Sequence, residues 1–448
     1  MKLTKILFLI SLISFSNAIL ISCRKNELYL DRLKPEIRLE PNDARFSSPL
    51  ILLSKDTVYL IGNSIEVKAG QILEIEAGTL IKVKNRVSVT ILPGAKILAS
   101  GEADAPIVFT SDAAVGTQGV IGSDGTGTNF WYGVRIYGSA STQPSFNSGV
   151  IKYMRIEFAG GDENFRGLPS LLFEDVSESM EINHVQVSYS FANHSYGFSG
   201  GNCNASHQIS YASNGNDFVF DNSFKGNLQN LLAYRHPFFP VLGPGPNLAG
   251  IYITGEGTLP ALSNITVLGP DDQKGNSLTY SERDPSASLL IAGNAKFKIR
   301  NSVFMSFPKA AFYMNSRNSA LALNTGESEF THSFVHSLDS TRVFYLPRNI
   351  YPPFTSGDFK EFMLEPGFNN EFVLMSKNFL LNDPFDYDNT PDPFPGQGSP
   401  LLNGANFTGT VFSNPFFNKV PYRGALGTDN WFEGWVNFIP LQTDYNNK

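Results

Sequence analysis

Hydrophobic and polar residues alternate with a period of two along most of the chain. Residues 94–112 read GAKILASGEADAPIVFTSD, in which Ala95 and Ile97 precede an acidic turn and Ile107 and Phe109 follow it. This period is typical of β-strands with one buried face, because successive side chains of a strand point to opposite sides. The stretch therefore predicts a strand, a corner and a second strand, with these four side chains in the core.

The same alternation returns several times just before this stretch. Turns rich in glycine separate the short runs, as in KAG, EAGT and LPGAK. The pattern predicts a chain that bends every few residues into another strand. The apolar positions are Ile65, Val67, Leu73, Ile75, Ile81, Val83, Val87, Val89 and Ile91.

Two later segments are similar to each other at an offset of 22 residues. VSYSFANHSYGFSGG begins at Val187 and ISYASNGNDFVFDNS begins at Ile209, which aligns Phe198 with Phe220. A repeat of this length matches one turn of a parallel β-helix, in which equivalent residues of successive turns stack about 4.8 Å apart. The sequence therefore predicts an all-β fold, a right-handed parallel β-helix built as a single-stranded solenoid of about ten rungs, each with three short strands.

Composition agrees with an ordered, strand-rich protein. The 448 residues include 39 Gly, 27 Pro and 37 Phe, and 42% of them are hydrophobic. The formal net charge is −7 and there is no long basic stretch, so we expect no nucleic-acid partner. Of the two cysteines, Cys203 is interpreted as a small buried residue rather than a nucleophile.

The first 22 residues have the features of an export signal. Lys2 and Lys5 precede an apolar run, residues 6–15, that is too short to span a bilayer. The run leads into LISC, residues 20–23, which resembles the lipobox of bacterial lipoproteins. The resemblance implies a lipid anchor on Cys23. Because Arg24 rather than Asp follows this cysteine, we expect the anchor to lie in the outer membrane, with the protein facing the periplasm or the cell surface. The alternative is an ordinary secretory signal cleaved after a small residue such as Ala18.

Charge density divides the rest of the chain. Residues 24–45 hold 11 charged residues among 22, so we expect residues 23–48 to form a tether that buries little surface. The β-helix is then expected over residues 49–380, followed by a loop-rich capping segment, residues 381–448, packed on it. We expect the protein to be a monomer.

Several longer blocks form a distinctive set. They are EAGTLIKVK, ILPGAKILASGEADAPIVFTSD, WYGVRIYGSAS and GVIKYMRIEFAGG, with GSPLLNGANF and VPYRGALGTDNWFEGWVNFIP near the C-terminus. These blocks closely resemble the right-handed parallel β-helix lipoproteins of the Bacteroidetes group. The resemblance implies a β-helix of the cell envelope, and it brings no established reaction with it.

Candidate ligand-binding residues lie mainly on the rungs around the repeat. Where the similar family carries acidic doublets on successive rungs, this chain keeps only two carboxylates. Three histidines on neighbouring rungs would form a basic cluster if they share a face, and ordinary hydrogen-bonded histidines are the alternative. The candidates are Asp217, Asp221, His184, His194, His207 and Trp131.

Aromatic clusters beside turns offer a second kind of site. NFWYG, YRHPFF and DNWFEGW place large rings next to polar residues, as in sites where rings stack on sugar faces. The alternative is that these rings fill corners or cover the ends of the coil, where strand edges are otherwise unpaired. For Trp131, Trp431 and Trp435 the burial or capping interpretation is favoured.

An acidic loop is a candidate for Ca²⁺. NDPFDYDNTPDP, residues 382–393, is rich in oxygen ligands but does not match an EF-hand, because Pro391 stands where that motif needs glycine. Asp386 and Asp388 are the better pair of ligands, and a solvated loop braced by prolines is the alternative. No other cofactor is expected.

Two functions of different classes follow. The first is a non-catalytic lipoprotein of the cell envelope, whose extended flank binds a polysaccharide or a protein partner; it is favoured because no catalytic constellation converges. The second is a polysaccharide lyase or glycoside hydrolase acting in a groove along the coil. Asp217, Asp221 and a basic side chain gathered in one cleft would favour the enzyme.

Overall fold

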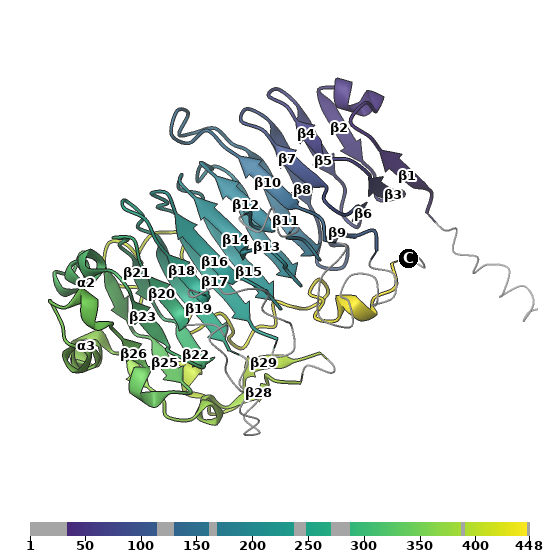
Figure 1. The fold of residues 1–448 in the computed structure, drawn as a ribbon. Coiled ribbons are helices and arrows are strands. Elements are labelled where there is room, and N and C mark those ends of the chain that lie inside the picture. The colour runs from purple at the N-terminus through teal and green to yellow at the C-terminus, as the bar shows by residue number, and fades with distance from the viewer. Residues whose placement is uncertain are drawn as a thin grey trace, which may run out of the picture.

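The computed structural model describes residues 34–113, 130–160, 168–236, 248–269, 287–386 and 390–445. Within these ranges the chain winds as a parallel β-helix (Figure 1). Each turn places two short strands or one bent strand on one side and a single strand on the other. The predicted all-β, parallel β-helical fold is confirmed.

The ten-stranded sheet takes one strand from each turn, so its strands are neighbours in chain order. Its pairings are parallel, as between β14 and β16. Ten stacked strands agree with the expected number of rungs. The strands are β4 (Ile65–Val67), β7 (Ser88–Ile91), β10 (Gly133–Tyr137), β12 (Leu171–Glu174), β14 (His194–Ser199), β16 (Asn216–Asp221), β18 (Ala249–Ile253), β20 (Ala287–Ile291), β23 (Phe312–Met314) and β26 (Phe344–Tyr345).

The 17-stranded sheet consists of two flanks that meet at a bend. In the middle rungs one long strand crosses the bend: β11 (Gly149–Glu157), β13 (Glu181–Ser188), β15 (Ala205–Tyr211), β17 (Asn227–Tyr234) and β19 (Ala261–Leu268). Toward the N-terminus the flanks have separate strands: β1 (Glu36–Leu39), β2 (Leu50–Leu53), β3 (Val58–Ile61), β5 (Ile72–Ile75), β6 (Leu80–Val83), β8 (Lys96–Ser100) and β9 (Ile107–Ser111). Toward the C-terminus they are β21 (Lys298–Arg300), β22 (Val303–Phe307), β24 (Glu329–Thr331), β25 (Phe334–Ser337) and β27 (Glu371–Phe372).

The stretch at residues 94–112 forms β8, a corner and β9, as predicted. The side chains of Ala95, Ile97, Ile107 and Phe109 are all buried. β8 and β9 pair with the two halves of β11, so the corner between them marks the bend of the sheet. A strict period of two therefore located both strands and their inward faces.

The aligned repeat is one turn of the coil. Phe198 pairs with Phe220 in adjacent strands, and their ring centroids lie 5.2 Å apart. Tyr196 and Phe218 stack beside them at 4.7 Å. Each buried aromatic ring removes a large apolar area from water, so such stacks stabilise the coil by about 2–3 kcal/mol per ring.

The coil begins earlier than residue 49. Strand β1 pairs with β3, and a short 3-10 helix, Ala44–Ser47, follows it inside the segment expected to be a tether. Leu39 is fully buried, whereas Glu36 and Arg38 face outward. A count of charged residues does not predict this strand, because the charged residues alternate with apolar ones and lie only on its solvent side.

Two short helices lie at the C-terminal end of the coil: α2 (Arg317–Asn324) and α3 (Ser356–Met363). Phe359 and Met363 of α3 are buried in the same cluster as the coil interior. Within the described ranges, no helix combines the length and apolar character needed to cross a membrane. The coil end is therefore covered by α3 rather than by the segment after residue 380.

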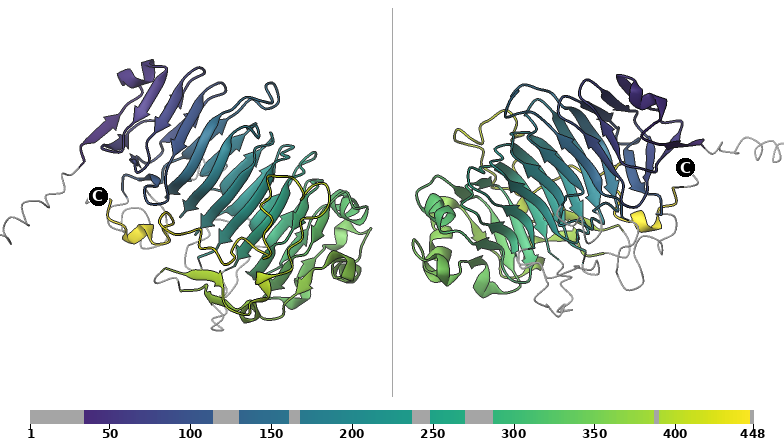
Figure 2. Two further views of the ribbon diagram at one scale, coloured as in Figure 1. Left: turned by 180° about the vertical axis from the view of Figure 1, so that it is seen from behind. Right: turned by 45° about the horizontal axis from the view of Figure 1, so that its top comes forward.

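The last part of the chain lies along the flank of the coil, as the yellow trace in Figure 2 shows. We call residues 400–445 the C-terminal strap. Three side-chain amides of the 17-stranded sheet each bind both the backbone N–H and the backbone C=O of one strap residue, as a neighbouring strand would. The pairs are Gln186 with Asn437, Gln229 with Asn418, and Asn301 with Asn406.

The strap ends near the first rungs. The Tyr445 hydroxyl binds the fully buried carboxylate of Glu157, at 2.7 and 2.8 Å. The Tyr445 ring packs with Val58, Leu80 and Val108. The C-terminal strap thus lies over the side of the β-helix rather than over its end.

Candidate functional site

One row of residues marks the bend of the 17-stranded sheet. Each has a left-handed backbone, with φ between 46° and 59°, which turns the chain from one flank of the sheet to the other. Asparagine tolerates this conformation best, while histidine and tyrosine adopt it less often. The row, which we call the bend row, comprises Tyr153, His184, His207, Asn230, Asn264, Asn301 and His332.

His184 and His207 are brought together in this row. Their rings stack with centroids 4.4 Å apart and an interplanar angle of 5°. Tyr153 stacks on the other face of His184, also at 4.4 Å, and the edges of Trp431 and Trp435 in the strap cover the pair.

Both imidazoles are therefore held neutral. Burial, with contributions from His207 and Lys152, lowers the pKa of His184 to about 3. Burial lowers the pKa of His207 to about 4, and its Nε2 lies 2.9 Å from the Asn230 amide. A neutral stack beneath the strap is a packing element, not the open basic cluster that a lyase needs.

His194 lies away from this pair. It begins β14 in the ten-stranded sheet, opposite Asn216, whereas the other two histidines lie in the 17-stranded sheet. Burial lowers the pKa of His194 to about 4. The three histidines therefore do not share a face.

Asp217 points into the coil. It is fully buried, its carboxylate lies 2.9 Å from Nε of Arg235, and it accepts a hydrogen bond from Ser210 at 2.6 Å. Arg235 also donates to the backbone carbonyls of Ser213 and Gly215. Burial raises the pKa of Asp217 to about 6, while Arg235 and Ser210 act in the opposite direction.

Asp221 lies at the other end of β16, on the outer face. It pairs in register with Ser199, which pairs with Glu174, so two carboxylates lie two rungs apart on this sheet. Burial raises the pKa of Asp221, and burial together with Asp221 raises that of Glu174. Asp217 and Asp221 thus have different surroundings and do not share a cleft.

The remaining candidates are also placed. Trp131 is fully buried and its indole N–H donates to the carbonyl of Glu157, which leaves no surface for a ligand. Cys203 is buried as expected, and burial raises its pKa.

Cys23 and Asp388 lie outside the described residues. Among the described residues, no three His, Cys, Asp or Glu side chains are grouped to hold a metal, and Asp386 belongs to no such group.

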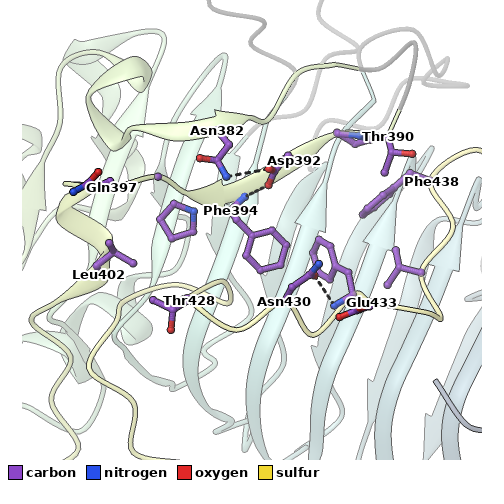
Figure 3. A pocket seen from close by; sticks show the side chains of 16 residues that line it. Asn382, Thr390, Asp392, Phe394, Gln397, Leu402, Thr428, Asn430, Glu433 and Phe438 are labelled. Carbon is purple, nitrogen blue, oxygen red and sulfur yellow. Dashed lines mark hydrogen bonds between the residues drawn. The ribbon is translucent and has the colours of Figure 1, made fainter. Parts of the chain in front are cut away.

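A pocket of about 680 Å³ opens between the strap and a small hairpin (Figure 3). The hairpin is the antiparallel pair β28 (Leu381–Asp383) and β29 (Asp392–Pro395). The ring centroids of Phe394 and Phe432 lie 4.8 Å apart, and those of Phe432 and Phe438 lie 5.6 Å apart. Three rings from the hairpin and the strap therefore form the aromatic part of the lining.

Polar groups surround these rings. The Asp392 carboxylate accepts hydrogen bonds from the Asn382 amide at 2.9 Å and from the backbone N–H of Phe394 at 3.1 Å (Figure 3). Asn430 accepts from the backbone N–H of Phe432, which fixes the turn that carries Glu433. The pocket thus combines aromatic surface with carboxylates, amides and hydroxyls, the mixture that binds polar organic ligands such as sugars.

The fold defines a β-helix protein whose strands stack in parallel sheets. The chain belongs to the family described as the pectate-lyase-like β-helix domain, whose model matches residues 45–343. Neither the comparison with curated proteins nor that with solved structures gives a match. Every residue lining the pocket lies after residue 343, so the pocket is formed by the part of the chain outside the family match.

The sequence contained both walls of the pocket without showing that they meet. NDPFDYDNTPDP includes Asn382 and Asp392, and DNWFEGW includes Phe432 and Glu433. The first is a candidate Ca²⁺ loop, with a solvated loop as the alternative, and the second is a candidate for sugar stacking or for capping. Their contact depends on the path of the strap, which no local pattern encodes.

Proposed function

We propose that this protein is a non-catalytic, lipid-anchored protein of the outer membrane that binds a glycan in the pocket between the hairpin and the strap. The observation that supports this most directly is the pocket itself. Its volume of about 680 Å³ lies within the range of small-molecule sites, and it combines three aromatic rings with hydrogen-bonding side chains.

Binding is favoured over catalysis by the placement of the other candidates. A lyase needs a base and a charge-neutralising group in one cleft. Here the histidine pair is covered by the strap, and the carboxylate of Asp217 is held by Arg235 inside the coil. The alternative is a glycoside hydrolase that uses Asp392 and Glu433, because two carboxylates lining one pocket are the minimum for that reaction.

The anchor is a separate part of the proposal. Its support is the lipobox-like sequence that ends at Cys23, 13 residues before β1 begins at Glu36. Replacing Cys23 with Ser is expected to abolish incorporation of labelled palmitate and to move the protein from the membrane fraction to the soluble fraction. If the Cys23→Ser variant carried no label but stayed in the membrane fraction, this result would contradict a lipid anchor.

The binding proposal is tested by screening a glycan array with the chain from residue 24 onward, which contains every described residue. We expect retention of at least one glycan and no new reducing or unsaturated ends. Phe432→Ala should weaken binding about tenfold or more, because a stacking ring is lost. Phe416→Ala, a half-buried ring outside the pocket, is the matched control. New chain ends would favour the hydrolase, and absence of any bound glycan would contradict the proposal.

A further inference from the structure

The lining of the pocket has an uneven charge. Two of its side chains are carboxylates, Asp392 and Glu433, and none of the described lining residues is Lys, Arg or His. Both carboxylates belong to exposed side chains of the pocket lining. A ligand with positive groups is therefore favoured and one with negative groups is disfavoured.

The Asp392 carboxylate has a fixed position. One oxygen accepts from the Asn382 amide and the other from the Phe394 backbone N–H, so the group is oriented before a ligand arrives. Each carboxylate oxygen has a second lone pair that remains able to accept. Such a preorganised acceptor binds an ammonium group with little loss of its own side-chain freedom.

Aromatic faces add a second attraction for cations. The ring centroids of Phe394 and Phe432, which line the same pocket as Asp392, lie 4.8 Å apart. The face of an aromatic ring attracts a nearby ammonium group. The same rings stack on the apolar face of a sugar. A sugar that carries an amino group satisfies both features at once.

We propose that the pocket selects glycans with free amino groups over neutral glycans and rejects glycans built from uronic acids. This inference rests on the proposed glycan-binding function and specifies its ligand class. An opposite charge about 6 Å from a carboxylate near the protein surface changes affinity by roughly ten- to a hundredfold, and a like charge changes it in the other direction.

Calorimetric titration with three sets of oligosaccharides of equal length tests the selection. The probes are glucosamine oligomers with free amino groups, their N-acetylated neutral counterparts and oligogalacturonates, at about pH 6, where the amino groups are charged. We expect the free amino oligomers to bind about tenfold or more tightly than the neutral ones, and the preference to shrink at high salt.

The variant Glu433→Gln removes one charge from an exposed side chain and should reduce the preference without abolishing binding of the neutral oligomers. Glu361→Gln, an exposed carboxylate on α3, is the matched control and should leave the preference unchanged. Equal affinity for all three sets, or tighter binding of the uronates, would overturn the charge selection while leaving glycan binding intact. Failure of every set, together with an empty glycan array, would instead contradict the proposed function.

Discussion

Inside the coil, the carboxylate of Asp217 and the guanidinium of Arg235 form an ion pair in which both side chains are almost fully buried. Taking two charges out of water is unfavourable, and their attraction offsets this only when the remaining polar atoms are also bonded. Ser210 and the carbonyls of Ser213 and Gly215 supply those bonds. The pair therefore holds the corner between β15 and β16.

Asp217→Asn should destabilise the protein by about 3–5 kcal/mol, because the charge of Arg235 would remain buried without its partner. Asp221→Asn, four residues away on the outer face, should change stability by less than about 0.5 kcal/mol. Denaturant unfolding of both variants against the parent checks this. Similar losses for the two variants would contradict the structural role of the buried pair.

The stacked pair His184 and His207 predicts a dependence on pH. Their folded-state pKa values, about 3 and about 4, lie below the unfolded value of about 6.5, so the folded protein favours the neutral rings. The stability they contribute is complete above the unfolded pKa and is lost as the pH falls toward the folded values. At pH 5 the loss is about 1–2 kcal/mol for each ring, allowing for partial exposure.

The variant His184→Asn/His207→Asn should be less sensitive to acid, because asparagine fits the left-handed bend, as Asn230 does in the next rung, and does not titrate. We expect its loss of unfolding free energy between pH 7 and pH 5 to be smaller than that of the parent by about 2–4 kcal/mol. Denaturant titrations at the two pH values measure this difference. An equal loss in both proteins would show that these rings do not sense acid.

The direction of side chains at the corners of the coil could not be predicted from the sequence. Along straight strands, alternation correctly placed Ala95, Ile97, Ile107 and Phe109 in the core. Asp217 is polar and close to a corner, where the strict alternation between the two faces does not apply. A polar residue there is expected to be exposed, and its inward position depends on Arg235 from the next rung, which local sequence does not reveal.

At the scale of elements, the strap is held to the coil by side chains that act as a neighbouring strand. Gln186 and Gln229 each bind both the N–H and the C=O of one strap residue, with distances between 2.7 and 2.9 Å. A buried backbone group that loses its partner costs about 1–3 kcal/mol. These amides therefore determine where the strap lies, and with it one wall of the pocket.

Gln229→Met should loosen the strap, because the N–H and C=O of Asn418 would lose their partner. We expect limited proteolysis to cut within residues 400–445 about tenfold faster or more, since a loss of about 2 kcal/mol raises the open population by that order. Gln208→Met is the control, because Gln208 is equally buried and its side-chain amide donates to the backbone carbonyl of Ser206 rather than to the strap. Equal cleavage of both variants would contradict a specific clamp.

The N-terminal boundary shows the limit of composition as a guide to elements. The segment EIRLE is strongly charged, yet its alternation of Ile37 and Leu39 with outward charges makes it strand β1. The boundary expected at residue 49 followed from charge density averaged over 22 residues. The alternation of apolar and charged residues, which indicates the strand, is visible only in a window of a few residues and is lost when the charge is averaged over 22.

At the scale of the whole molecule, the described residues form a scaffold of stacked turns, ten of which contribute a strand to one sheet, and its stability comes from contacts between adjacent turns. The family match ends at residue 343, and the pocket lies wholly beyond it. The fold could be predicted from the repeat because each rung has the same inward pattern. The pocket could not, because it joins a hairpin at residues 381–395 to a strap segment at residues 427–438 through long-range packing.

The central claim is that ligand binds between the hairpin and the strap rather than along the flank of the coil. Hydrogen exchange of the protein with and without a glycan retained on the array tests this most directly. We predict slower exchange at residues 390–397 and 427–438, which line the pocket, and no change in the strands of the ten-stranded sheet. Protection confined to that sheet, with the pocket segments unchanged, would contradict the claim.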